Sequence, residues 1–431
     1  MTPDPQPPIG PGRTRQNAIY RAGVFGHTPR VPTDAVELEA RARAAMSDTA
    51  WAYVAGGAGE GATMRANREA FDRWRIVPRV LHGRTDRDLT TSVLGTDLAA
   101  PLLLAPIGAA CLVKPDSDVL IARGAAATHT PYVLSSQGCN PMEETAAAMA
   151  GTPFWHQLYW SVDEALVDSM IGRAEAAGAR ALVVTVDTPV LGWRPQDLNR
   201  GALPFARGLG IAHYTSDPRF RQLVRERVAA ADGVRAKTEV TLGAVRSLVS
   251  MSRAHPGDLR DNLRSPEPRA AVETFLGVFS NPALSWDHIA TLRGRTSIPV
   301  LLKGVLHPED ARRALDLGVD GVIVSNHGGR QVDRSVASLD ALVAIRDALG
   351  PEPVVLLDSG IRTGVDVFLA LALGADACLL GRPAIYGLAL DGADGVAEVL
   401  TNVVAELDLT MGLVGAASLA DVTRELLVPA P

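Results

Sequence analysis

A histidine and an arginine follow directly after a buried apolar run near residue 325. The run Val322–Val324 is β-branched and lacks polar alternation, which predicts a strand buried on both faces. Gly328 and Gly329 allow a tight turn between His327 and Arg330. An imidazole titrates near neutrality, and a guanidinium has the planar fork that matches a carboxylate. We therefore expect proton transfer and carboxylate binding here; the alternative is a turn with a surface histidine and arginine.

Two further ionisable residues end apolar runs. Lys303 follows Val300–Leu302, and a lysine buried there needs an anionic or polar partner. Asp187 lies between Thr185 and Pro189, where it either caps a turn or pairs with His327 and raises its basicity. The histidines show no metal-ligand spacing, so no metal site is predicted.

A phosphate site is predicted near the C-terminal end of the chain. The segments Asp358–Arg362 and Gly381–Pro383 each combine a glycine with an arginine after an apolar run. Glycines let the backbone approach a phosphate, and Arg362 or Arg382 supplies charge. These segments predict a cofactor or substrate that bears phosphate.

Apolar runs alternate with amphipathic segments from about residue 100 onward. The predicted strands are Pro101–Ile107, Tyr132–Ser135, Phe154–Tyr159, Ala181–Asp187, Val300–Gly304, Val322–Asn326, Val354–Asp358 and Ala377–Gly381. The segments between most of them are Ala-rich, and several end in glycine, as helices do. The pattern predicts an α/β fold, a (β/α)8 TIM barrel, whose site lies at the strand ends. A doubly wound sheet is the alternative, but no G-x-G-x-x-G follows the first strand.

The segments outside this alternation of apolar runs and amphipathic segments give the predicted domain organisation. Residues 1–33 are predicted to be a flexible tail, and 34–431 a single barrel domain that begins with a helical segment. The glycine-rich run Tyr53–Gly61 is predicted to form a turn between two helices of this N-terminal segment. Residues 188–297 form a long insertion after the fourth strand, charged and weakly patterned at 219–269. We expect a partly disordered lid or an oligomer contact, or else a surface insertion without a role.

Composition excludes several classes of partner. The net charge is −6 and no basic run stands out, so neither nucleic acid nor an anionic membrane is expected. The apolar stretch Ala99–Val113 is too short to span a membrane. Three scattered cysteines predict no disulfide framework, and the default compartment is a reducing cytoplasm.

These residues resemble the FMN-dependent L-2-hydroxy acid oxidase/dehydrogenase family. The segment Ser325–Gln331 is similar to the family signature, and the resemblance covers about Asp34 to Val422. Within the family, Gly192–Leu198 and Leu203–Leu209 are most similar to the lactate 2-monooxygenase branch. The resemblance implies FMN as cofactor, a small L-2-hydroxy acid as substrate, O2 as acceptor and a tetramer or octamer.

The resemblance also implies roles for individual residues. His327 is the base, and Asp187 stabilises its imidazolium. Arg330 binds the substrate carboxylate together with Tyr53 and Arg194. Tyr159 binds the substrate hydroxyl, and Lys303 tunes the flavin. The implied cofactor-binding residues are Pro106, Ile107, Gly108, Ser135, Gln157, Thr185, Lys303, Ser325, Asp358, Gly360, Arg362, Gly381 and Arg382.

Three features depart from the family pattern: Gln137 and Gly138 beside the expected substrate tail, the length of the insertion, and Cys111–Lys114. Several activities therefore stay open. They are oxidation with decarboxylation in the site, oxidation that releases H2O2, a dehydrogenase acting on a larger, mandelate-like acid, and a non-redox FMN-barrel isomerase or phosphate-ligand binder. The choice between carbanion and hydride chemistry also stays open.

Overall fold

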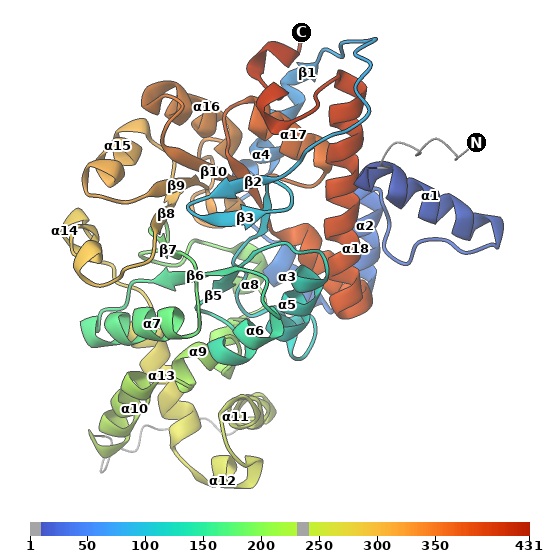
Figure 1. The fold of residues 1–431 in the computed structure, drawn as a ribbon. Coiled ribbons are helices and arrows are strands. Elements are labelled where there is room, and N and C mark those ends of the chain that lie inside the picture. Colours follow the sequence, from blue (N-terminus) through green and yellow to red (C-terminus); the bar gives the residue numbers. More distant parts are fainter. Residues whose placement is uncertain (1–9, 231–240) are drawn as a thin grey trace.

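Eight parallel strands close into a barrel (Figure 1). The computed structural model describes residues 10–230 and 241–431. The barrel strands are β4 (Leu102–Leu104), β5 (Tyr132–Ser135), β6 (Phe154–Tyr159), β7 (Leu182–Thr185), β8 (Val300–Val305), β9 (Gly321–Val324), β10 (Val354–Asp358) and β11 (Ala377–Leu380). They follow one another around the barrel in chain order, and β11 pairs with β4 to close it. Each strand overlaps one predicted run, so the predicted (β/α)8 fold is confirmed.

Helices cover the outside of the barrel. They are α5 (Ser117–Ala127), α6 (Met142–Ala148), α7 (Glu164–Ala176), α15 (Pro308–Asp316), α16 (Ser338–Leu349), α17 (Gly364–Ala372) and α18 (Arg382–Val414). Side chains alternate along a strand, so Val322 and Leu302 pack outward on helices while Leu301 and Trp155 fill the barrel interior. This double burial explains the continuous apolar runs of the sequence.

A β-hairpin that the sequence analysis did not predict packs against the barrel interior. It consists of β2 (Thr91–Val93) and β3 (Thr96–Leu98). Val93 and Leu98 join the interior cluster, and the Trp155 indole donates to Thr96 Oγ1 at 3.0 Å.

A second two-stranded sheet pairs β1 (Trp74–Ile76) with β12 (Leu427–Pro429). Short 3-10 turns are η1 (Ala110–Leu112), η2 (Pro204–Arg207), η3 (Leu292–Gly294), η4 (His327–Gly329), η5 (Leu419–Asp421) and η6 (Arg424–Leu426).

The N-terminal segment is helical from residue 11. It comprises α1 (Pro11–Val24), α2 (Ala35–Ala45), α3 (Asp48–Ala55) and α4 (Ala62–Asp72). The predicted flexible tail over 1–33 is therefore wrong for residues 11–24, and residues 1–9 lie outside the described part. The first turns of helix α1 contact α18, and its other end projects away from the barrel (Figure 1). Gly12 N donates to Asp408 at 2.9 Å, and Arg15 Nε donates to Asn402 at 2.7 Å. Residues 56–61 of the predicted turn connect α3 to α4, while residues 53–55 belong to α3.

The insertion after β7 is largely helical. Its helices are α8 (Pro195–Leu198), α9 (Ala212–Thr215), α10 (Pro218–Ala230), α11 (Leu242–Ala254), α12 (Leu259–Arg264), α13 (Glu267–Val278) and α14 (Trp286–Ala290). Phe205, Tyr214, Phe220, Phe275 and Phe279 form one aromatic cluster that holds η2, α9, α10 and α13 together. Partial disorder was predicted for this insertion; these helices are folded, while residues 231–240 lie outside the described part. The sequence did not indicate the cluster because its aromatic residues are widely spaced along the chain.

Cys111 and Cys139 form a disulfide, with Cα atoms 6.0 Å apart. The sequence predicted no disulfide framework and did not indicate this single cross-link, while Cys378 is free and buried. The two residues are 28 positions apart, but they lie in the loops after β4 and β5, which are neighbours in the barrel. Among the residues described, no helix combines the length and the apolarity that crossing a bilayer requires.

Candidate active site

A cavity of about 930 Å³, solvent at its mouth included, lies at the carboxyl ends of the barrel strands. All eight strand ends or the loops after them contribute to its wall, as does α3. The predicted residues that line it are Tyr53, Pro106, Ile107, Gly108, Tyr159, Arg194, Lys303, His327, Arg330, Asp358, Gly360, Arg362, Gly381 and Arg382. The other predicted residues are outside its lining: Ser135, Gln157, Thr185, Ser325 and Asp187. The first four of these are buried, and Asp187 contacts His327.

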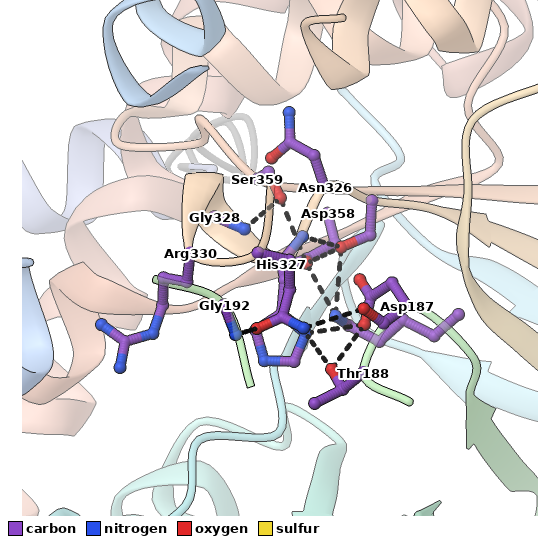
Figure 2. A network of polar contacts seen from close by, with 12 residues as sticks. Asp187, Thr188, Gly192, Asn326, His327, Gly328, Arg330, Asp358 and Ser359 are labelled. Atoms are coloured by element: carbon purple, nitrogen blue, oxygen red, sulfur yellow. Dashed lines mark hydrogen bonds and ion pairs between the residues drawn. The ribbon is translucent and has the colours of Figure 1, made fainter. Parts of the chain in front are cut away.

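His327 is held in a constrained turn that aims its imidazole at Asp187 (Figure 2). Its φ of +58° lies in the left-handed region, which a side chain with Cβ seldom adopts. Two hydroxyls fix the turn: Ser325 Oγ accepts from His327 N at 3.0 Å, and Ser359 Oγ accepts from Gly328 N at 2.8 Å. His327 Nδ1 lies 2.9 Å from Asp187 Oδ1. Because Nδ1 is engaged, Nε2 is the nitrogen left for proton transfer.

The electrostatics of this pair favour a neutral imidazole beside an ionised carboxylate. Burial lowers the pKa of His327, although Asp187 opposes this shift. Burial alone would raise the pKa of Asp187, but His327, Lys303 and the Thr188 hydroxyl outweigh it, so its pKa is lowered. At neutral pH the histidine is therefore ready to accept a proton, and the carboxylate is ready to stabilise the imidazolium.

Lys303 is the partnered buried lysine that the sequence predicted. Its register partner on β7 is Thr185, and its ammonium lies 3.1 Å from both Asp358 Oδ2 and Ser325 Oγ. Ser325 Oγ in turn donates to Asp358 Oδ2 at 2.6 Å. Burial disfavours both charges, but their attraction outweighs it: the pKa of Lys303 is raised and that of Asp358 is lowered. A fixed positive charge thus borders the cavity.

Two guanidiniums lie close together at another part of the cavity. Arg330 stacks over the Tyr53 ring, 4.9 Å from its centroid, and donates to the backbone oxygens of Tyr53 and Gly56. Arg194 donates to Arg330 O at 3.2 Å and to Gln331 Oε1 at 2.8 Å. Burial and then Arg194 lower the pKa of Arg330 to about 9, so it stays cationic at neutral pH. Neither guanidinium forms an ion pair with a described carboxylate, which leaves both suited to an anionic ligand.

Tyr159 places a phenol at the end of β6, where it lines the cavity. Burial raises its pKa, with Asp187 contributing, so the hydroxyl stays protonated and can donate. The side chain is 8% exposed and forms no hydrogen bond with the described residues. It therefore has a donor available for a ligand oxygen.

Buried amide and hydroxyl groups lie behind the cavity on β5 and β6. Gln157 is the register partner of Ser135, whose hydroxyl donates to Gln157 Oε1 at 3.3 Å. Gln157 Nε2 is buried and has no hydrogen-bond partner among the described residues. A buried donor without a partner costs free energy, so a ligand that accepts from it is favoured. The heteroaromatic edge of a flavin supplies such acceptors.

The loops after β10 and β11 have the composition of a phosphate site. Gly360 has a φ of +91°, and a Cβ there would lie 2.8 Å from a backbone oxygen. A Cβ on Gly381 would stand 3.5 Å from Ile107 Cδ1, within cavity space. Helix α18 begins at Arg382 without a side-chain cap, and neither Arg382 nor Arg362 pairs with a carboxylate among the described residues. The Arg382 guanidinium donates to the backbone oxygens of Val54, Gly56 and Gly328, which leaves Arg362 as the cation more available to a phosphate. Together with the backbone of Gly360 and Gly381, which lines the cavity, this suits the phosphate of FMN.

The structure also adds residues that sequence reasoning did not single out. Thr188 donates to Asp187 Oδ1 at 2.9 Å and lies 3.4 Å from His327 Nδ1. Gln331 donates to Asp187 O at 2.9 Å. Leu191 and Phe205 of the insertion complete the wall. Only proximity in sequence to predicted residues could have indicated them.

Comparison with known proteins agrees with this geometry. The FMN-dependent dehydrogenase family matches residues 42–429. The chain is 38% identical over 421 residues to the FMN-dependent alpha-hydroxy acid dehydrogenase qulF of Penicillium citrinum. This alignment covers 97% of this chain and 96% of the relative. It is 38% identical over 371 residues to an L-lactate oxidase of Lysinibacillus sphaericus, 85% of each chain. A crystal structure of mandelate oxidase with (S)-4-hydroxymandelic acid matches with a TM-score of 0.75 and 33% identity, covering 93% of this chain and 99% of the other.

Proposed function

The chain belongs to the FMN-dependent dehydrogenase family and uses FMN, and on this premise we propose that it oxidises a small L-2-hydroxy acid to the 2-keto acid with O2 as acceptor. The observation that carries the proposal is the juxtaposition of the His327–Asp187 pair with two guanidiniums, Arg330 and Arg194, that form no ion pair with a described carboxylate. Oxidation of a 2-hydroxy acid to the 2-keto acid removes two electrons and two protons. It therefore needs a base that takes a proton and a site that holds the carboxylate, beside the cofactor that accepts the electrons.

Each residue has a role that follows from its contacts. Arg330 and Arg194, with Tyr53 stacked beneath Arg330, bind the substrate carboxylate. His327 removes a proton, and Asp187 stabilises the charge that develops on the imidazole.

Two further residues act on the oxygen that changes and on the cofactor. Tyr159 donates to the substrate oxygen as it becomes a carbonyl. When bound, FMN supplies the two-electron acceptor, and Lys303 supplies positive charge that favours electron uptake by the ring.

We further propose that the keto acid stays bound long enough to be decarboxylated, as in lactate 2-monooxygenase. Lactate and O2 then give acetate, CO2 and water. This is supported by the wall that Leu191 and Phe205 of the insertion add, which hinders product escape. The second candidate is release of pyruvate and H2O2, favoured by the similarity to an L-lactate oxidase. A dehydrogenase acting on a larger acid is the third, and the fold match to mandelate oxidase supports the larger acid.

Product analysis during aerobic turnover of L-lactate separates these candidates. Acetate and CO2 equal to the O2 consumed support the monooxygenase. Pyruvate and H2O2 in equal amounts refute decarboxylation while leaving the oxidation intact. Fast reduction of the flavin with slow reoxidation by air refutes O2 as the acceptor.

We propose that the protein acts in the cytoplasm, where the Cys111–Cys139 disulfide is an exception to the reduced state usual for thiols. We further propose that it is a homo-oligomer, a tetramer or octamer, and that neither nucleic acid nor a membrane is a partner. The net charge of −6 supports the last point. Light scattering after gel filtration tests the assembly, and a monomeric mass contradicts it.

A further inference from the structure

Gln137 is a polar side chain inside the cavity that the proposed reaction does not use. It lies after β5, lines the cavity and is only 6% exposed. Its backbone N–H donates to Ser135 Oγ, but its side-chain amide forms no hydrogen bond with any described residue. Because this amide borders the cavity and has no partner in the protein, it is suited to a ligand that can both donate and accept.

The surrounding loops hold Gln137 in a defined position. Ala109 N donates to Gln137 O at 3.0 Å, which ties the loop after β4 to the loop after β5. A Cβ on Gly108 would lie 2.6 Å from Gln137 Cβ and 3.1 Å from its Oε1. The Cys111–Cys139 disulfide joins the same two loops. The amide is therefore preorganised, so little entropy is lost when a ligand binds it.

The ligand group that faces Gln137 should be uncharged. The charged residues of the cavity already have assigned partners: Lys303 pairs with Asp358, and His327 with Asp187. The arginines are assigned to the substrate carboxylate and the cofactor phosphate. The remaining wall residues include the apolar Leu191 and Phe205. Among the described residues of the cavity wall, no charge is then left to neutralise an ionised substrate tail. An uncharged hydroxyl that bonds the amide can instead be buried beside the apolar side chains.

We propose that Gln137 hydrogen-bonds a hydroxyl on the substrate side chain, so that the enzyme prefers hydroxylated L-2-hydroxy acids over alkyl ones of the same size. This proposal rests on the proposed function and names its substrate class. An alkyl tail leaves the amide buried and unpaired, and this is how a polar pocket rejects an apolar analogue. Lactate is then a substrate of the right chemistry that lacks the recognised group.

Two matched pairs of acids test the proposal. L-Glycerate differs from L-2-hydroxybutyrate by a hydroxyl in place of a methyl, and (2S)-2,4-dihydroxybutyrate differs in the same way from L-2-hydroxyvalerate. The ratio of kcat/KM within each pair is measured for the wild type and for Gln137→Met, which keeps length but removes the amide. The control is Gln222→Met, an exposed glutamine on α10 that contacts Glu226. The FMN content of each protein reports folding.

We expect the hydroxylated acid to be preferred by about tenfold or more in at least one pair, which is the effect of one hydrogen bond with an otherwise unpaired partner. Gln137→Met should abolish that preference and Gln222→Met should keep it. Should Gln137→Met lose its FMN, Gln137→Leu serves in its place.

A wild-type ratio near one in both pairs, or an unchanged ratio in the Gln137 variants, overturns the proposal while the proposed function stands. If no 2-hydroxy acid reduces the bound flavin, the proposed function itself fails, and this proposal with it.

Discussion

Replacing Asp187 by asparagine removes the charge that faces His327 while keeping the shape of the side chain. Unit charges 2.9 Å apart interact by about 6 kcal/mol at an effective dielectric constant of about 20. The value suits this pair because the two side chains are only 19% and 12% exposed. In the transition state the proton is about half transferred, so the imidazole carries about half a positive charge. The variant therefore loses about half of this interaction there, about 3 kcal/mol, which slows flavin reduction roughly a hundredfold. An amide that donates to Nδ1 would also select the wrong tautomer and add to the loss.

Anaerobic stopped-flow reduction of the flavin by L-lactate measures this loss without interference from O2. The FMN-loaded Asp187→Asn variant should be reduced about a hundredfold more slowly than the wild type, or slower still. Asp287→Asn, at an exposed position of α14, is the matched control and should react at the wild-type rate. A reduction rate within about threefold of the wild type, at equal FMN content, would refute the assigned role of Asp187.

Four further outcomes follow from the same geometry. Arg330→Lys should raise KM or the substrate Kd by about tenfold or more with a smaller effect on the reduction rate, because lysine lacks the planar fork; an unchanged Kd would contradict carboxylate binding there. Arg362→Ala should weaken FMN binding by about tenfold or more, measured by fluorescence titration of the apoprotein, and unaltered affinity would remove Arg362 from the phosphate site. The flavin reduction rate should fall as the pH drops through the pKa of His327, which lies below its ordinary value of 6.5, because only the neutral imidazole accepts a proton; a rate that rises toward acid pH would contradict the base assignment. Replacing Cys111 and Cys139 together by serine should lower the free energy of unfolding by up to about 3–4 kcal/mol, since the disulfide closes a loop of 28 residues. The wild type treated with reductant should unfold like the variant. Equal denaturation midpoints of the wild type with and without reductant would contradict the cross-link.

Much of the barrel could be predicted from sequence because its strands are buried on both faces. Runs such as Val322–Val324 carry no polar residue, so their position and type are clear from composition alone. Parallel strands in a barrel share one carboxyl edge, so the polar residues that end each run had to converge. Lys303 and His327, far apart in sequence, were therefore expected in one cavity, and both line it.

The sequence failed where structure depends on contacts between distant segments. Helix α1 is polar and lacks a clear apolar stripe, and it is held by contacts to α18 such as Arg15–Asn402. The helices of the insertion share a cluster that includes Phe205 and Phe275, which are 70 positions apart by their numbers. The Cys111–Cys139 bond joins two loops that the pairing of β4 with β5 brings together.

The most direct test of the central claim is the visible spectrum of the protein during anaerobic titration with L-2-hydroxy acids, for the wild type and for His327→Ala. The panel is glycolate, lactate, 2-hydroxybutyrate, phenyllactate and mandelate. We predict that at least one acid bleaches the flavin of the wild type, and that none bleaches it in His327→Ala although FMN stays bound. A wild-type flavin that no acid reduces, or a His327→Ala flavin reduced at the wild-type rate, would contradict the claim that His327 is the base for 2-hydroxy acid oxidation.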